Sequence, residues 1–183
     1  MTSPNKLAAP GLRALLRGGA LSGEWELDSR RSSIALKHRS LGGLVRVNGA
    51  FGQVDGSGTI SPDSGVSGSV TVAAASINTK NKRRDKHLRS TDFLDSDHHP
   101  QITFTVDQIE PSAGATAVTG ALMVRDRARP MSFDAAVSVP LDGEIWLDAE
   151  VDINRADFGL TWNSMGLLSM NNVLTIHTVF TRR

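Results

Sequence analysis

Residues 76–100 read SINTKNKRRDKHLRSTDFLDSDHHP and interrupt the pattern of the chain on both sides of them. The segment carries six basic residues between positions 80 and 89, and its apolar side chains do not alternate with polar ones. Charge without alternation predicts one or two short helices that cross an end of a β structure. Ser90, with Asp92 behind it, is typical of a helix start, and Pro100 predicts a stop before the next strand.

Outside this segment, apolar and polar residues alternate in short runs, as in EIWLDAEVDIN at residues 144–154. Such runs predict strands with one face inside the fold and the other in water. Roughly eight to ten runs at regular spacing favour a sandwich or a barrel. Because closure removes open sheet edges, we expect an all-β fold with a single antiparallel barrel of about eight strands. The short helical insert would lie near residues 80–98.

Two local features bear on the course of the strands. Asp55-Gly56 is a hairpin signal and predicts a tight turn at that point. Residues 173–181 should form the last strand, but they are apolar on both faces in part. The sequence therefore does not assign which face of that strand points inward.

Small side chains recur at positions that should point into the barrel, namely Gly49, Gly120, Ala135 and Ala149. Only 5% of the residues are aromatic, and the chain contains no tyrosine. A barrel of about eight strands either fills its interior with side chains or holds one small ligand there. Small inward residues favour the second case and predict a lumen, which a strongly flattened barrel would remove.

The overall composition bounds the classes of partner and location. A net charge of +1 gives no support for nucleic acid as a partner, because phosphate binding needs a basic excess. No apolar run approaches the roughly 20 residues that span a bilayer, so we expect no stable membrane insertion. Residues 1–23 lack the features of a secretory signal, which predicts a cytoplasmic protein. We expect an N-terminal arm over residues 1–23 and one barrel domain over residues 24–183.

Few residues form a pattern that suggests catalysis or metal binding. Asp95, Asp97, His98 and His99 are metal-capable, but adjacent histidines point apart in most conformations, and surface clusters of this kind are common without metal. No G-x-S-x-G motif occurs, and the absence of cysteine excludes thiolate ligands and a cysteine nucleophile. The 84–87 segment could supply an acid–base group, although a structural ion pair is favoured. We therefore expect no catalytic residue, no metal and no cofactor.

Several ordered motifs carry a resemblance to a known family. They are N-x-x-R-D-x-H-L-R-S-x-D-F beginning at Asn81, V-N-G-A-F at residues 47–51, and I-N-R-A-D-F-G-L at residues 153–160. Together with matching pieces over nearly all of residues 24–182, they resemble the YceI-like family of lipocalin-like, polyisoprenoid-binding barrels. Leu94 departs mildly from the family, which normally has an aromatic residue there.

The resemblance implies a carrier that holds a long amphipathic isoprenoid lipid in its lumen: a polyisoprenoid, its phosphate or an isoprenoid quinone. Arg84 and His87 would meet the polar head of the lipid, and His38, inward by parity, would mark the polar end of the lumen. The full set of expected ligand-binding residues is Ile34, Leu36, His38, Val47, Phe51, Val70, Val72, Arg84, His87, Phe104, Val106, Leu122, Phe133 and Trp162.

Two other functions remain open on the sequence. One is an enzyme that acts on such a lipid, in one version with a metal held by the segment rich in His and Asp. The other is a structural protein with a solid barrel. A homodimer is possible in each case, through the apolar residues 158–172 or the N-terminal leucines.

Overall fold

The computed structural model describes residues 9–40, 45–63, 65–112, 115–140, 143–163, 166 and 168–183. The helices are α1 (Ala9–Arg17) and α2 (Lys82–Arg89), with short 3-10 turns η2 (Ala74–Ser76) and η3 (Arg155–Phe158). The strands are β1 (Gly23–Leu27), β2 (Ser33–Ser40), β3 (Val45–Phe51), β4 (Val54–Ser61), β5 (Gly65–Ala73), β6 (Ile77–Asn78), β7 (Gln101–Pro111), β8 (Thr116–Val124), β9 (Arg127–Ser138), β10 (Glu144–Asn154) and β11 (Leu168–Arg182).

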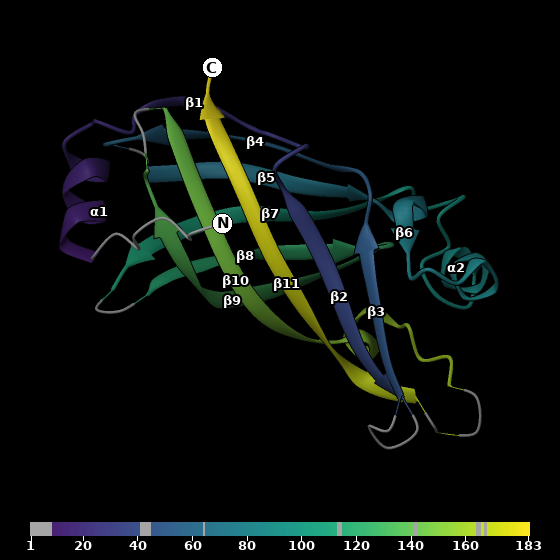
Figure 1. Ribbon diagram of the computed structural model, residues 1–183. Coiled ribbons are helices and arrows are strands. Elements are labelled where there is room, and N and C mark those ends of the chain that lie inside the picture. The colour runs from purple at the N-terminus through teal and green to yellow at the C-terminus, as the bar shows by residue number, and fades with distance from the viewer. Residues whose placement is uncertain are drawn as a thin grey trace.

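The strands form one closed antiparallel sheet with the order β1-β4-β5-β7-β8-β9-β10-β11, which returns to β1 (Figure 1). β2, β3 and β6 occupy the same positions around the barrel as β1, β4 and β5, further along the barrel axis. For example, β11 pairs first with β2, up to Ser33↔His177, and then with β1, from Leu27↔Phe180. The barrel therefore has eight strand positions. This confirms the predicted all-β antiparallel barrel.

Alternating side chains explain which face of each strand lies inside. Along β8 the inward positions Thr116, Val118, Gly120, Leu122 and Val124 are all buried, and the residues between them are more exposed. Burial does not alternate along the last strand, whose inward face the sequence left open, but the lining of the interior assigns that face. Leu174, Ile176, Thr178 and Phe180 of β11 line the interior.

Asp55-Gly56 does not form the predicted hairpin, because both residues lie inside β4. The chain instead bends between β3 and β4, where Gly52 N donates to Ser76 O at 3.2 Å and Ala73 N donates to Gln53 O at 3.1 Å. A Cβ at Gly56 would lie 2.8 Å from Ser69 O on β5. The glycine thus serves the close approach of two strands rather than a turn.

The helix of the charged segment begins earlier than Ser90. Asn81 is its N-cap, and the Asn81 side chain accepts a hydrogen bond of 3.0 Å from Arg84 N. Ser90 is the C-cap, and its Oγ donates to His87 O at 2.8 Å. The predicted helix start at Ser90 is therefore wrong, because Asn81, an equally good N-cap, starts the helix only four residues after the first residue of β6. The predicted position of the helical insert is correct.

The two helices lie toward opposite ends of the barrel (Figure 1). In α1, Leu12 is only 3% exposed and packs in the same core cluster as Leu21 and Trp25. Arg13 Nη2 donates to Pro111 O at 2.6 Å and ties α1 to the end of β7. No helix in the described part of the chain has the length and apolarity needed to cross a bilayer. The division at residues 23 and 24 into arm and domain stays a prediction.

Candidate functional site

The interior of the barrel contains a cavity of about 580 Å³. This volume falls within the range of about 300–1,000 Å³ that small-molecule pockets occupy. The lining extends from Leu12 and Leu16 of α1 at one end to Arg84 and His87 of α2 at the other. The cavity therefore runs along the barrel between the two helices.

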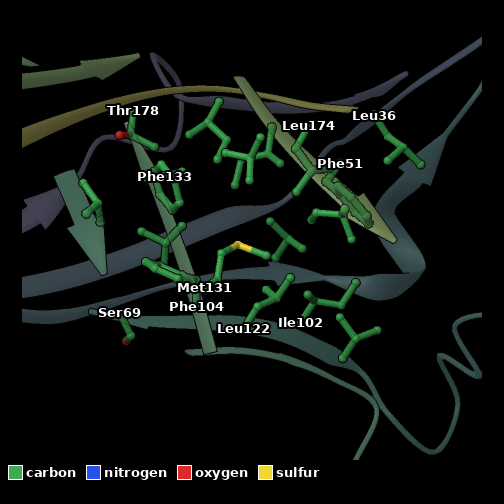
Figure 2. Close-up of a pocket in the computed structure, with 18 of the residues that line it drawn as sticks. Leu36, Phe51, Ser69, Ile102, Phe104, Leu122, Met131, Phe133, Leu174 and Thr178 are labelled. Atoms are coloured by element: carbon green, nitrogen blue, oxygen red, sulfur yellow. The ribbon is translucent and has the colours of Figure 1, made fainter. Parts of the chain in front are cut away.

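Apolar side chains from opposite walls line this lumen. Figure 2 shows Leu36 and Leu174 on one side and Leu122 and Met131 on the other, turned toward a common space. Leu36 and Leu174 are register partners on β2 and β11, so they form one continuous patch. Phe104 and Phe133 add further apolar surface, with ring centroids 5.5 Å apart. Such a wall favours the hydrocarbon part of a ligand.

The small inward residues explain the lumen less well than the sequence analysis supposed. A Cβ at Gly120 would lie 2.8 Å from the Phe104 ring, which already occupies that space. A Cβ at Gly49 would lie 2.9 Å from the Thr79 methyl group. Ala135 and Ala149 are packed in the core cluster. The glycines thus let neighbouring side chains and strands pack closely, and they are not themselves the space that forms the lumen.

All of the residues expected to bind ligand lie on the lining of this one cavity, although they come from six strands, a helix and a loop. They are Ile34, Leu36, His38, Val47, Phe51, Val70, Val72, Arg84, His87, Phe104, Val106, Leu122, Phe133 and Trp162. Their position is thus a structural observation, and their role in binding stays a prediction.

A polar pair lies inside the apolar lining. His38 Nδ1 and Asn172 Oδ1 are 2.8 Å apart, and Asn172 is buried at the start of the long pairing between β11 and β2. Burial lowers the pKa of His38, the hydrogen bond with Asn172 opposes that effect, and the charge of Arg155 lowers the pKa further. At neutral pH the imidazole is therefore neutral and, since Asn172 Oδ1 accepts, Nδ1 carries the proton.

Arg84 and Asp85 are joined through Thr79 rather than to each other. Asp85 Oδ1 accepts from Thr79 N at 2.9 Å and from Thr79 Oγ1 at 2.5 Å. Arg84 donates from Nε to Thr79 Oγ1 at 2.7 Å and from Nη2 to Thr79 O at 2.9 Å. These bonds fasten α2 to the end of β6. The sequence favoured a structural ion pair among Arg84, Asp85 and His87, and the link between Arg84 and Asp85 runs instead through this shared threonine.

Aromatic rings surround the α2 end of the lumen. His87 stacks edge-on against Trp162 and Phe93, with centroids 4.4 Å and 5.1 Å away. His87 Nε2 also lies 3.0 Å from Asp92 Oδ2. Trp162 is 37% exposed, so this group lies where the lumen meets the surface.

Arg155 and Asn172 are polar lining residues that were not predicted from the sequence. Arg155 is 6% exposed, it begins η3 directly after β10, and its guanidinium lies over the Phe93 ring at 5.6 Å. Burial lowers its pKa from the ordinary arginine value. An arginine between a strand and a turn normally suggests an exposed side chain. The signal that could have found it is the motif at residues 153–160, whose arginine stands among apolar residues.

The aspartates and histidines near residues 95–99 lie outside the lumen lining. Asp95 Oδ1 is 2.9 Å from His98 Nδ1, and His99 Nδ1 is 3.3 Å from Asp126 Oδ1. Within the described ranges, no group of three or more His, Asp or Glu side chains has a metal-binding arrangement. The residues that would carry the metal-assisted alternative are thus engaged in pairwise contacts.

Residues 25–180 match the family model described as YceI-like domain. A UPF0312 protein of Pectobacterium carotovorum is 30% identical over 154 residues, which are 79% of each chain.

Among solved structures, the BcnA protein of Burkholderia cenocepacia superposes with a TM-score of 0.75 at 21% identity, over 84% of this chain and 98% of that one. A polyisoprenoid binding domain from Saccharophagus degradans superposes with a TM-score of 0.70 at 15% identity, over 87% of this chain and 98% of that one. At these identities the two structures show the shared fold alone.

Proposed function

Because the chain belongs to the YceI-like domain family, we propose that it is a carrier that holds a long amphipathic isoprenoid lipid in its lumen. The ligand class includes a polyisoprenoid alcohol, its phosphate and an isoprenoid quinone. The observation that carries the proposal is the apolar cavity of about 580 Å³ that runs between α1 and α2. The fold shared with the polyisoprenoid binding domain of Saccharophagus degradans supports the choice of ligand.

The energetics of such binding come from burying the tail. Removing apolar surface from water contributes on the order of 25 cal/mol per Å², and a preformed lumen loses little conformational freedom when the tail enters. A slender, branched chain can lie between the Leu36–Leu174 patch and Met131.

The proposed role is binding and release without turnover. The described lining contains no aspartate or glutamate, and its titratable side chains are His38, His87, Arg84 and Arg155. Acid–base catalysis needs a proton donor or acceptor within reach of the reacting group, and among the described lining residues the His38 imidazole, bonded to Asn172, is the candidate deep in the lumen. The cytoplasmic location and the possible homodimer stay predictions, which cell fractionation and size-exclusion chromatography test.

The proposal is tested by organic extraction of freshly purified protein and by uptake of added isoprenoids, both read by mass spectrometry. Wild-type protein should release an isoprenoid lipid and take it up again after stripping. Leu36→Trp should weaken uptake at least about tenfold, because crowding the lumen costs about 1–3 kcal/mol.

Thr175→Trp is the matched control. Thr175 follows Leu174 on β11, and its hydroxyl donates to the exposed Glu150 on the outer face at 3.4 Å. The control should take up lipid as wild type does. Absence of lipid in the extract together with no uptake by the wild-type protein would overturn the carrier proposal.

A further inference from the structure

Arg155 has two N–H groups that the described part of the protein leaves without a partner. Its Nε donates to Ser169 O at 3.1 Å, and Nη1 donates to Leu160 O and to Trp162 O. A guanidinium has five N–H groups, of which these bonds use three. Nη2 is buried and has no hydrogen-bond partner among the described residues.

Arg155 Nη2 differs in its position from the other buried side-chain atoms that lack a hydrogen-bond partner. Within the described ranges they are Ser22 Oγ and Arg89 Nε, and neither residue lines the lumen. Arg155 does line it. A buried donor without a partner lowers the stability of the fold by about 1–3 kcal/mol. Its presence at a binding cavity suggests that a ligand accepts its hydrogen bond.

The charge of Arg155 is also uncompensated. All of its hydrogen-bond acceptors are neutral carbonyl groups, and no ion pair joins it to a carboxylate among the residues the structure describes. Arg31 and Arg125, by contrast, pair with Glu144 and Asp95. A buried cation without a counter-ion is unfavourable, and a guanidinium N–H donates a stronger hydrogen bond to an anion than to a neutral acceptor.

The position of the guanidinium is fixed before any ligand arrives. Three carbonyl groups hold Nε and Nη1, and the Phe93 ring lies against the plane at 5.6 Å. Such a fixed donor pair loses little freedom when it binds. His38 is hydrogen-bonded to Asn172, and it lies close enough to Arg155 for the arginine charge to lower its pKa. These three side chains therefore form one polar group in an apolar wall.

We propose that Arg155 Nη2 binds a negatively charged oxygen group at the head of the lipid, a phosphate or a carboxylate. This inference rests on the proposed function and narrows it to anionic isoprenoids. It also moves the expected head-group contact from Arg84, whose Nε and Nη2 are already bonded to Thr79, to Arg155.

The test compares lipids with one tail and different heads. Geranylgeranyl phosphate, geranylgeranoic acid and geranylgeraniol are titrated into stripped protein, and binding is followed by tryptophan fluorescence, because Trp25 and Trp162 line the cavity. Both anions should bind wild type at least about tenfold more tightly than the alcohol, the factor expected for hydrogen bonds to charged groups. The two anionic arms show whether phosphate or carboxylate is preferred.

Arg155→Gln should remove this preference and leave the affinity for the alcohol within about twofold, since the apolar wall that holds the tail is unchanged. Arg155→Lys should restore part of the preference for anions, because lysine brings back the positive charge but lacks the planar set of guanidinium N–H donors. Arg129→Gln is the matched control: Arg129 also donates from Nε to a backbone carbonyl, that of Asp157, but it is exposed and does not line the lumen.

A measurement on unaltered protein covers the case in which Arg155 variants fail to fold. Phosphorus NMR of bound geranylgeranyl phosphate should show the second pKa of the phosphate below its value in detergent micelles, because a nearby cation favours the dianion. Equal binding of alcohol and anions by wild type, an unchanged phosphate pKa, or equal loss of all three lipids in a folded Arg155→Gln protein would overturn the inference. Failure of all three lipids to bind wild type would instead overturn the carrier proposal.

Discussion

At the α2 end of the lumen, the protonation state of His38 follows from its neighbours. Burial disfavours the imidazolium, the hydrogen bond with Asn172 favours it, and the positive charge of Arg155 disfavours it. The net effect lowers the pKa of His38 from the usual 6.5. His98 shows the opposite case, because its bond to Asp95 raises its pKa.

We predict that one NMR titration of the histidine ring signals separates these two residues. His38 should titrate below pH 6.5 and His98 above it. Asn172→Leu should lower the pKa of His38 further, since it removes the hydrogen bond that favours the charged ring. A His38 signal that titrates above that of His98 would contradict the described geometry.

The same shift gives His38 a defined effect on stability. The unfolded chain binds the His38 proton more tightly than the folded chain does. The contribution of neutral His38 to the free energy of unfolding is therefore complete above pH 6.5 and is lost as the pH falls through the lower pKa of the folded state. Acid unfolding of a His38→Gln protein should therefore lack the part of the stability loss that begins just below pH 6.5.

The lining residues show what a sequence can predict at this scale and what it cannot. Alternation on a strand gives the inward face, so Leu36, Phe51 and Phe104 could be assigned to the lumen from the pattern alone. Arg155 could not, because its burial depends on η3 and on three carbonyl groups of the segment that follows it. Those contacts are tertiary and leave no periodic signal.

At the scale of the element, α2 depends on its first turn. The helix has eight residues, and isolated helices of that length are marginal in water. The cap at Asn81 and the bonds of Asp85 and Arg84 to Thr79 hold it against β6. The sequence predicted the helix from its charge, but the predicted start was Ser90 rather than Asn81, and both residue types favour the N-cap position.

We predict that Asn81→Ala lowers the free energy of unfolding by about 1 kcal/mol, the usual loss for an N-cap. Urea unfolding followed by circular dichroism measures the change. Lys82→Ala is the control, because Lys82 is exposed at the first helical position. If the two variants lose equal stability, the hydrogen bond from Arg84 N to Asn81 does not cap the helix.

At the scale of the whole molecule, lipid binding depends on a closed barrel whose interior is not filled. Closure was predictable, because regular alternating strands leave open edges unless the sheet returns to itself. The reason for the lumen was only partly predictable. Gly49 and Gly120 looked like empty space in the sequence, yet the Thr79 methyl group and the Phe104 ring already occupy that space.

A crystal structure of the protein grown with geranylgeranyl phosphate would show directly whether the lumen holds the lipid. We predict that the tail lies between the Leu36–Leu174 patch and Met131, with phosphate oxygens within hydrogen-bond distance of Arg155 Nη2. A tail bound on the outer face of the barrel, with the lumen closed by side chains, would contradict the account.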